Sequence, residues 1–261
     1  MKIKKMAIDW LDSRLGVSEL LHQQLGGYKL PRNINTWYAL GAVIMALFGL
    51  QFLTGILLLI YYVPDTEKAF ASVTMIMNEV PFGWLFRYLH VVCSNLIIVA
   101  LLLHMMSVMF MGSYKRPREL TWISGFTLLN MGLVFCLTGY LLPWSQLSFW
   151  ATTVATDAAG AVPVVGEYLV SFLRGGPSVG AATLGRFFAL HVLVLPLALM
   201  GLVGFHLFCV RRNGISQAPL GKHYRPVEPS DTFTHEEHHD GIHFYPNYTS
   251  KEMGVIFFAL D

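Results

Sequence analysis

Four histidines stand at matched intervals inside two long apolar stretches of the chain. His90 and His104 are fourteen residues apart, and His191 and His206 are fifteen apart. On an α-helix, fourteen residues separate two side chains by roughly 21 Å and rotate them by only about 40°. A histidine inside lipid is costly and normally has a functional reason. If the two helices are antiparallel, His90 faces His191 and His104 faces His206.

Two facing pairs of imidazoles predict two haems. Haem iron takes axial imidazole readily, and ligation by two histidines closes both axial positions, which suits electron transfer rather than oxygen binding. The separation of roughly 21 Å fits inside a hydrocarbon core of about 30 Å. Cys93, Cys136 and Cys209 form no CxxCH motif, so no standard covalent haem attachment is expected and the cysteines are interpreted as small buried residues.

The elements that must position these histidines are membrane-spanning helices. The chain is 54% hydrophobic and only 13% charged, with a mean hydropathy of +0.52, which indicates an integral membrane protein. We expect an all-α membrane protein, a four-transmembrane-helix haem-binding bundle with short interfacial helices. The helices are expected near 36–63, 85–111, 121–142 and 184–210. They form a domain over 36–210, between an amphipathic surface segment, 1–35, and a polar tail, 211–261, that approaches a partner subunit.

Basic residues predict the orientation. They gather in the N-terminal arm, in the loop after the second helix and after the fourth helix, at Lys2, Lys4, Lys5, Arg14, Lys29, Arg32, Lys115, Arg116, Arg118, Arg211 and Arg212. The other two connections carry only Lys68 and Arg174. The positive-inside rule therefore places both termini on the cytoplasmic side. No basic patch with interleaved aromatic residues occurs, so nucleic-acid binding is not expected.

Glycines repeat the same interval on the two helices that lack the histidines. Gly41 and Gly55 are fourteen residues apart, and so are Gly125 and Gly139. A residue without Cβ lets a flat macrocycle approach the backbone closely. The alternative is that these glycines serve only helix packing.

Arginines near the helix ends are candidates for the haem propionates. Arg87 lies three residues before His90, and Arg186 lies five before His191. Arginine binds carboxylates through a two-pronged fork, although such residues also serve as snorkelling anchors. Arg118 and Trp122, at the start of the third helix, are candidates for the same role at the inner haem.

The connection over 143–183 is too long for a turn. It opens with Pro143, Trp144, Phe149 and Trp150, and 164–174 has a helical apolar pattern. We expect two short helices at the outer interface that cover the outer haem and shape a quinone pocket; an aromatic interfacial belt is the alternative. In the tail, HEEHHDGIH over 235–243 is interpreted as solvated rather than metal-binding, and Met253–Leu260 is too short to span a membrane.

A set of motifs in register resembles the N-terminal half of the cytochrome b family, most closely its b6 type. The likeness covers roughly 28–220 and includes TGILLLIYYVP at 54–64, FGWLFRYLH ending at His90, TGYLLPWSQLSFWA at 138–151, TLGRFFALH at 183–191 and RRNGISQAPL at 211–220. The fifteen-residue interval after His191 is also similar to the b6 type, since mitochondrial-type chains typically have fourteen there.

The resemblance implies the di-haem subunit of a quinol-oxidising, proton-translocating complex. Haem bL would lie between His90 and His191 and haem bH between His104 and His206. Residues matching the outer quinone region are Tyr140, Pro143, Trp144, Phe149 and Ala151, and Arg211 lies near the inner one. Implied partners are a Rieske iron-sulfur protein, a c-type cytochrome or plastocyanin-type acceptor and a second copy of the complex, in a prokaryotic cytoplasmic or thylakoid-type membrane.

Two departures from the b6 pattern change what is implied. Ala39 stands where b6 proteins have the cysteine that attaches a further haem, so no covalent haem c is expected. The family's PEWY-type loop is missing from the sequence, so a separate chain similar to the C-terminal half of cytochrome b, subunit IV-like, is expected to complete the outer quinone site.

Three alternatives remain open at this point. The chain resembles less well a haem b anchor of another respiratory oxidoreductase, which would lack the FGWLFRYLH and GYLLPWSQ context. A transporter whose histidines relay protons without haem is a second alternative. A structural subunit that has lost turnover is the third.

Overall fold

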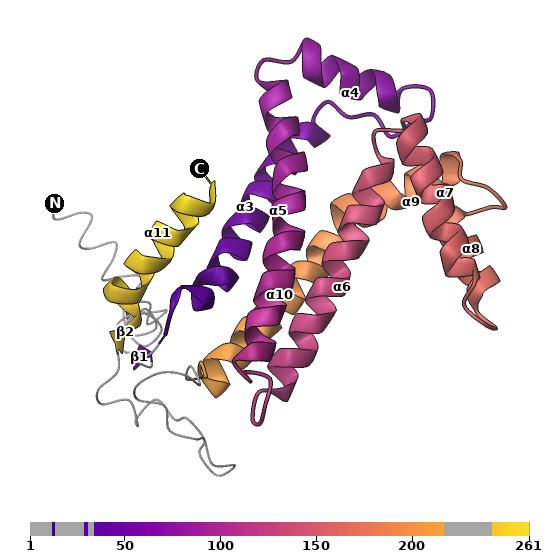
Figure 1. Cartoon of the computed structure of the whole chain (residues 1–261). Coiled ribbons are helices and arrows are strands. Elements are labelled where there is room, and N and C mark those ends of the chain that lie inside the picture. The colour runs from indigo at the N-terminus through magenta and orange to yellow at the C-terminus, as the bar shows by residue number, and fades with distance from the viewer. Residues whose placement is uncertain (1–11, 14–28, 31–33, 217–241, 261) are drawn as a thin grey trace. The chain divides into compact units, whose positions relative to one another are not determined.

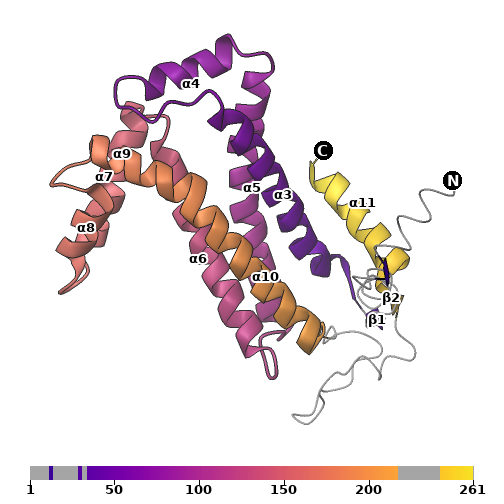
Figure 2. The ribbon, with the colours of Figure 1, turned by 180° about the vertical axis from the view of Figure 1, so that it is seen from behind.

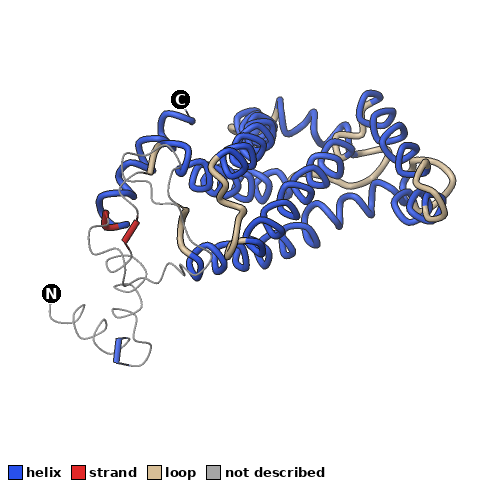
Figure 3. The backbone as a smooth tube through the Cα atoms, turned by 60° about the horizontal axis from the view of Figure 1, so that its bottom comes forward, coloured by secondary structure: helices blue, strands red, loops and turns tan. Residues whose placement is uncertain are grey.

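The structure is a computed structural model, and it describes residues 12–13, 29–30, 34–216 and 242–260 (Figure 1). Helix dominates these residues. The strands among them are β1 (Lys29–Leu30) and β2 (Ile242–His243), which pair antiparallel (Figure 3). The all-α fold class is confirmed, with this short strand pair as an addition. Most of the predicted surface segment 1–35 and of the His-rich stretch 235–243 lies outside the described residues.

The chain divides into two compact units. The larger one contains Ile44–Met105 and Leu120–Phe208, and the smaller one contains Met1–Val43, Met106–Glu119 and Cys209–Asp261. All four histidines of interest belong to the larger unit.

Four helices in the described part of the chain are long and apolar enough to cross a membrane, Thr36–Leu59, Gly83–Phe110, Glu119–Leu141 and Ala181–Asn213. They consist of η2 (Thr36–Ala39) with α3 (Leu40–Leu59), α5 (Gly83–Phe110), α6 (Glu119–Leu141), and α9 (Ala181–Ala189) continuing into α10 (Leu195–Asn213). A helix satisfies its backbone hydrogen bonds internally, which lipid requires. Within the larger unit, α5, α6 and α10 run along one another in Figures 1 and 2.

The fourth span is not a regular α-helix throughout. Residues Leu190–Val194, labelled η3, form a π turn in which the Leu195 N–H donates to the Leu190 carbonyl. Such a turn inserts one residue into a helix without ending it. Pro196 follows directly, and proline has no N–H to donate and crowds the carbonyl four residues earlier. His191 lies inside this turn.

Short helices occupy two of the connections. The expected pair between the third and fourth spans is present as α7 (Gln146–Gly160) and α8 (Gly166–Arg174). A further helix that the sequence did not lead us to expect, α4 (Ala69–Asn78), joins the first two spans. A capping box between Ser145 and Ser148 starts α7. Gly175 ends α8 in the left-handed region, with φ of 73°, where a side chain would be strained.

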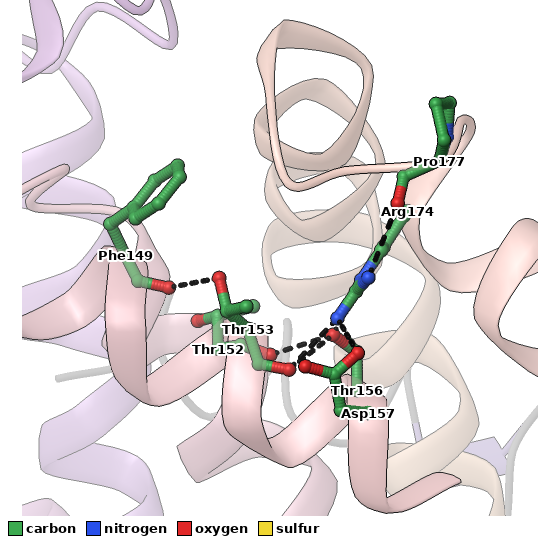
Figure 4. Close-up of polar contacts among 7 residues, drawn as sticks. All are labelled: Phe149, Thr152, Thr153, Thr156, Asp157, Arg174 and Pro177. Atoms are coloured by element: carbon green, nitrogen blue, oxygen red, sulfur yellow. Dashed lines mark hydrogen bonds and ion pairs between the residues drawn. The ribbon is translucent and has the colours of Figure 1, made fainter. Parts of the chain in front are cut away.

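One buried arginine holds α7 and α8 together. Arg174 is only 6% exposed, and its Nε donates to Thr156 Oγ1 at 2.7 Å. Its Nη2 donates to the Thr153 carbonyl at 2.8 Å and to Asp157 Oδ1 at 2.7 Å, while Nη1 reaches the Pro177 carbonyl at 3.3 Å (Figure 4). These hydrogen bonds offset the cost of removing the guanidinium from water. Three of these hydrogen bonds therefore tie Arg174, at the end of α8, to residues of α7.

An apolar cluster in the larger unit joins this hairpin to the ends of the spans. Its fully buried members include Leu141, Leu184 and Phe187. At its edge the Tyr62 hydroxyl donates to the Leu142 carbonyl at 2.7 Å, and burial raises the pKa of Tyr62. All three cysteines are free thiols; Cys93 and Cys209 are buried and Cys136 is half-buried.

The smaller unit has its own core. Buried Leu30 and Tyr248 pack with Tyr38 and Phe244, and the Tyr38 hydroxyl donates to the Ser216 carbonyl at 3.0 Å. The chain continues through η4 (Phe244–Tyr248), which is kinked at an extended Tyr245 (φ −112°, ψ 136°), into α11 (Thr249–Leu260), which contacts η2. The apolar run Met253–Leu260 thus forms part of a docked helix of twelve residues.

Candidate cofactor site

The four candidate ligands lie in two pairs within the larger unit. His90, on α5, and His191, in the π turn, have ring centres 6.4 Å apart and ring planes inclined by 71°. His104 and His206, on α5 and α10, lie close enough to interact electrostatically. All four side chains are half-buried. The structure thus brings together the residues that helix spacing suggested as partners.

The separation of His90 and His191 fits two imidazoles on one metal ion. A metal–imidazole bond is about 2.0 Å and the ring nitrogen lies about 1.1 Å from the ring centre, so opposite ligands have centres about 6.2 Å apart. The observed distance is 6.4 Å. The spacing of the two rings therefore matches that of two imidazoles on one metal ion.

Three of the histidines are held by buried hydroxyl groups. The Nδ1 atom of His90 lies 2.9 Å from Thr54 Oγ1, that of His206 lies 2.9 Å from Ser124 Oγ, and that of His191 lies 3.1 Å from Thr138 Oγ1. These bonds join α5 to α3, α10 to α6 and the π turn to α6. All three hydroxyl residues are at most 3% exposed, so their polar atoms need partners. The hydrogen bonds fix the orientation of each ring.

The same contacts indicate which ring nitrogen carries the proton. Each hydroxyl donates to a carbonyl of its own helix: Thr54 to Leu50 at 2.7 Å, Ser124 to Thr121 at 3.0 Å and Thr138 to Val134 at 2.9 Å. A hydroxyl has one proton, so it then accepts from the imidazole Nδ1–H. Backbone carbonyls of Gln51, Thr121 and Phe135 also bond to the three rings. Nε2 is left with its lone pair, as a metal ligand requires.

The glycines make room for these rings. A Cβ atom built on Gly139 would lie 2.6 Å from Cε1 of His191, and one on Gly55 or Gly125 would lie 3.2 Å from Cε1 of His90 or His206. The nearest side chain to each of these three glycines is therefore an imidazole. The sequence suggested the haem macrocycle as that neighbour. The remaining candidate, Gly41, is half-buried near the start of α3.

Sequence reasoning missed the three hydroxyl residues. A signal was present, because Thr54, Ser124 and Thr138 each directly precede one of the recurring glycines. The fourth glycine, Gly41, follows Leu40 instead. A search for hydroxyl–glycine pairs at the fourteen-residue interval would have found Ser124 and Thr138.

The two outer arginines differ in what they contact. Arg186 Nη1 donates to the Ser171 and Phe172 carbonyls near the end of α8, and a Cβ atom on Gly175 would lie 2.9 Å from its guanidinium. Arg87 is half-buried, and within the described residues it makes no hydrogen bond or ion pair. Arg186 is therefore engaged with α8, whereas Arg87 is available.

The inner candidates lie on different elements. Arg118 is 6% exposed and its Nε donates to the Gly214 carbonyl at 3.1 Å, while Trp122 is half-buried on α6. Arg211 Cζ lies 4.9 Å from the ring centre of Phe244 and interacts electrostatically with the half-buried Glu252. Burial raises the pKa of Glu252, and Arg211 partly opposes that shift.

Part of the outer quinone candidate set is assembled. The Trp144 and Phe149 rings meet edge to face at 5.8 Å, and both pack against the buried apolar cluster. Trp144 has φ of 50°, a sparsely populated conformation for a bulky residue, as functional sites often show. Tyr140 is 49% exposed and not part of that cluster, and Pro143 and Ala151 are half-buried. Ala39, at the position of the covalent-haem cysteine, is buried in η2.

The chain is similar to known proteins over most of its length. The family model described as Cytochrome b/b6/petB matches residues 25–214. Cytochrome b6 of Synechococcus elongatus is 41% identical over 80% of this chain and 96% of its own length. The cytochrome b/c1 of Bradyrhizobium diazoefficiens is 38% identical over 97% of this chain, which spans only 35% of that longer protein.

A solved structure supports the same relationship. A chain of a hyperthermophilic respiratory Complex III matches with a TM-score of 0.84 and 38% identity, over 97% of this chain and 65% of that one. The family model covers most of the sequence, and family membership implies b-type haem as the cofactor. The chain described here is an integral membrane protein that belongs to the cytochrome b/b6 family.

Proposed function

We propose that this chain carries electrons across a membrane through two non-covalent b haems, as a subunit of a quinol-oxidising, proton-translocating complex. The observation that carries the proposal is the distance of 6.4 Å between the ring centres of His90 and His191, the spacing of two imidazoles on one iron. Both rings are oriented by buried threonines, which favours Nε2 as the ligand atom.

The second haem follows from the same construction. His206 is held by Ser124 as His191 is held by Thr138, and Ser124 and Thr138 are fourteen residues apart on α6. His104 supplies the opposite ring. Haem with two histidine ligands supplies one-electron transfer without an open position for oxygen. Two such centres, roughly 21 Å apart along the helices, would form a path between the membrane faces.

Arg87 is the better partner for a propionate of the outer haem. It lies three residues before His90 and is not committed to another group in the described residues. Arg186 already donates to two carbonyls of α8. A bidentate contact from Arg87 would neutralise a carboxylate near the helix end. At the inner haem, Arg118 and Trp122 stay predictions.

Quinone sites are proposed at both ends of this path. The strained Trp144 and its contact with Phe149 support an outer site beside α7. In the smaller unit, Arg211 interacts electrostatically with the half-buried Glu252, which supports proton uptake at an inner quinone site formed by these residues. Quinol oxidation would release protons outside, and quinone reduction would consume them inside.

The relatives support the proposed partners. The chain covers nearly all of a cytochrome b6 but about a third of a cytochrome b/c1 protein. We infer that a subunit IV-like chain supplies the C-terminal half of the outer quinone site. A Rieske protein and a c-type cytochrome or similar acceptor would take the electrons, in a homodimeric complex.

The basic residues support both termini on the cytoplasmic side. Lys115 and Arg116 follow the end of α5, and Arg211 and Arg212 lie in the last turn of α10, whereas the opposite connections carry Lys68 and Arg174. A reporter fused after Asp261 should be active only in its cytoplasmic form. Activity of an exported reporter at that position would reverse the assignment.

The haem assignment is tested by spectroscopy of the complex purified in detergent. Reduced-minus-oxidised spectra with a pyridine haemochrome assay should give two b haems per chain, both removed by acid-acetone. His90→Ala and His104→Ala should each remove one haem, while His235→Ala in the tail should remove none. A chain without haem would sink the electron-transfer function, and a haem retained after extraction would overturn the inference drawn from Ala39.

A further inference from the structure

Helix α6 presents its two histidine-binding hydroxyls at a fixed interval. Ser124 bonds to His206 and Thr138 bonds to His191, and these hydroxyl residues are fourteen positions apart. The histidines that they hold are fifteen positions apart. The fourth span therefore carries one residue more than the helix against which its histidines are held.

One extra residue changes the direction of a helical side chain. Each residue rotates an α-helix by about 100°, so fourteen residues leave two side chains about 40° apart and fifteen leave them about 60° apart in the opposite sense. His90 and His104 keep the interval of fourteen on α5. A regular α-helix from His191 to His206 would turn one imidazole away from its partner by about 100°.

The π turn removes this mismatch. Between Leu190 and Val194 the backbone bonds over five residues instead of four, as the bond from the Leu195 N–H to the Leu190 carbonyl shows. This turn absorbs one residue, so the fifteen positions act as fourteen. The turn runs from Leu190 to Val194 with His191 at its second position, so most of it lies between the two histidines.

Pro196 determines where the turn lies. In a regular α-helix, position 196 would donate its N–H to the Val192 carbonyl, but proline has none and its ring crowds that carbonyl. A wider turn over Leu190–Val194 relieves the clash. Elsewhere in the span, α9 and α10 are regular α-helix. The extra residue is thus placed by the proline.

We propose that Pro196 is a positioning residue that fixes the π turn at His191 and so keeps His191 and His206 in the fourteen-residue register of α5 and α6. The inference rests on the proposed two-haem function. The inference concerns the helix backbone between His191 and His206, so it predicts how one-residue deletions in the fourth span affect haem binding.

Three variants of the full chain, purified in its complex, separate the possibilities. Deleting Val194 shortens the interval to fourteen but keeps the proline, which still requires a wider turn, so the effective register falls to thirteen. Deleting Ala198 gives the same interval and also leaves Pro196 and the π turn in place, so the effective register is again thirteen. The third variant combines the Ala198 deletion with Pro196→Ala, which frees the turn to become α-helix. Val194 and Ala198 are both exposed side chains, so neither deletion removes a core residue.

The readouts are haem b per chain, the reduced-minus-oxidised spectrum and the amount of tagged chain in the membrane. The Val194 and Ala198 deletions should each fall to about one haem, and the combined variant should return toward two. Two haems kept by either single deletion, or no recovery on adding Pro196→Ala, would overturn the role of Pro196. If the Ala198 deletion fails to accumulate, recovery of membrane levels by Pro196→Ala is the deciding result. A wild-type chain without haem would instead overturn the proposed function itself.

Discussion

Thr138 Oγ1 lies 3.1 Å from Nδ1 of His191, and the same hydroxyl donates to the Val134 carbonyl at 2.9 Å. The buried threonine hydroxyl therefore links a backbone carbonyl of its own helix to an imidazole on another span, in a relay of two hydrogen bonds. Thr54 and Ser124 repeat this relay for His90 and His206. Three hydroxyls thus orient three of the four candidate ligands.

Replacing Thr138 with valine tests the relay. Thr138→Val keeps the side-chain shape but removes the acceptor for the His191 ring, so the outer haem should be held about 10–100-fold more weakly. Haem retention during detergent titration and the midpoint potential of each haem are the measurements. Thr138→Ser, which keeps the hydroxyl, should behave like the wild type. An unchanged outer haem in the valine variant would show that the hydroxyl does not support the ligand.

Alanine at the glycines should reduce haem content in a graded order. A Cβ atom at Gly139 would approach His191 Cε1 to 2.6 Å, whereas at Gly125 it would stay 3.2 Å from His206 Cε1. Gly139→Ala should therefore displace its ring and lose the outer haem, and Gly125→Ala should cost less. Gly49→Ala is a matched control on α3, because nothing lies within 4 Å of its Cβ position. Haem per chain gives the order, and equal loss at Gly49 and Gly139 would contradict it.

Removing the Arg174 guanidinium should loosen the hairpin of α7 and α8. Arg174→Met leaves the buried Thr156 hydroxyl and Asp157 without their donor. Breaking a buried pair costs about 3–5 kcal/mol. Because the Asp157 side chain is 62% exposed, the lower end of that range is expected. Arg116→Met is the control, since its ion pair with Glu119 is solvent-exposed and worth less than about 1 kcal/mol.

Limited proteolysis of the α7–α8 connection and the thermal unfolding midpoint measure this effect. Faster cleavage near Val164, 93% exposed between the two helices, is expected for Arg174→Met alone. Equal midpoints and cleavage rates for the two arginine variants would count against the clamp.

The docking of α11 should weaken as pH rises. Burial raises the pKa of Glu252 above its ordinary value of 4.5, although Arg211 partly opposes the shift. A group with a raised pKa in the folded state stabilises that state most below the unfolded value, and the contribution is lost as pH rises through the folded value. Hydrogen exchange of residues 249–256 should therefore quicken with rising pH, beyond its intrinsic dependence, from about 4.5 upward.

Glu252→Gln provides the comparison for this pH dependence. The amide is neutral throughout, so the variant should keep its protection above the pKa range and lose the additional slope. Lys251→Gln, at an exposed neighbouring position, should retain the slope. The prediction is wrong if the wild type and Glu252→Gln show the same pH profile.

Much of the fold and of the candidate site could be predicted from the sequence, because the structure of a membrane-spanning helix depends mainly on its own residues. A long apolar run must be helical in lipid, and a helix of known rise places residues fourteen apart on nearly one face. The four spans, the fold class and the family were therefore accessible from composition, spacing and motifs. Glycine recurrence likewise marked the helices that approach the histidines.

What only the tertiary structure decided concerns contacts between helices and local departures from regular geometry. Sequence spacing treated the interval from His191 to His206 as a family signature, whereas the structure shows a π turn that restores the register. The commitment of Arg186 to α8, and the availability of Arg87, depend on where α8 ends at Gly175. The sequence interval between two residues gives the relative direction of their side chains only while the helix keeps its regular i to i−4 hydrogen bonds. The residues that a side chain contacts on another helix depend on how the helices pack. The sequence alone determined which residues are candidates for the chemistry; the folded chain decided how three of the four candidate histidines are held.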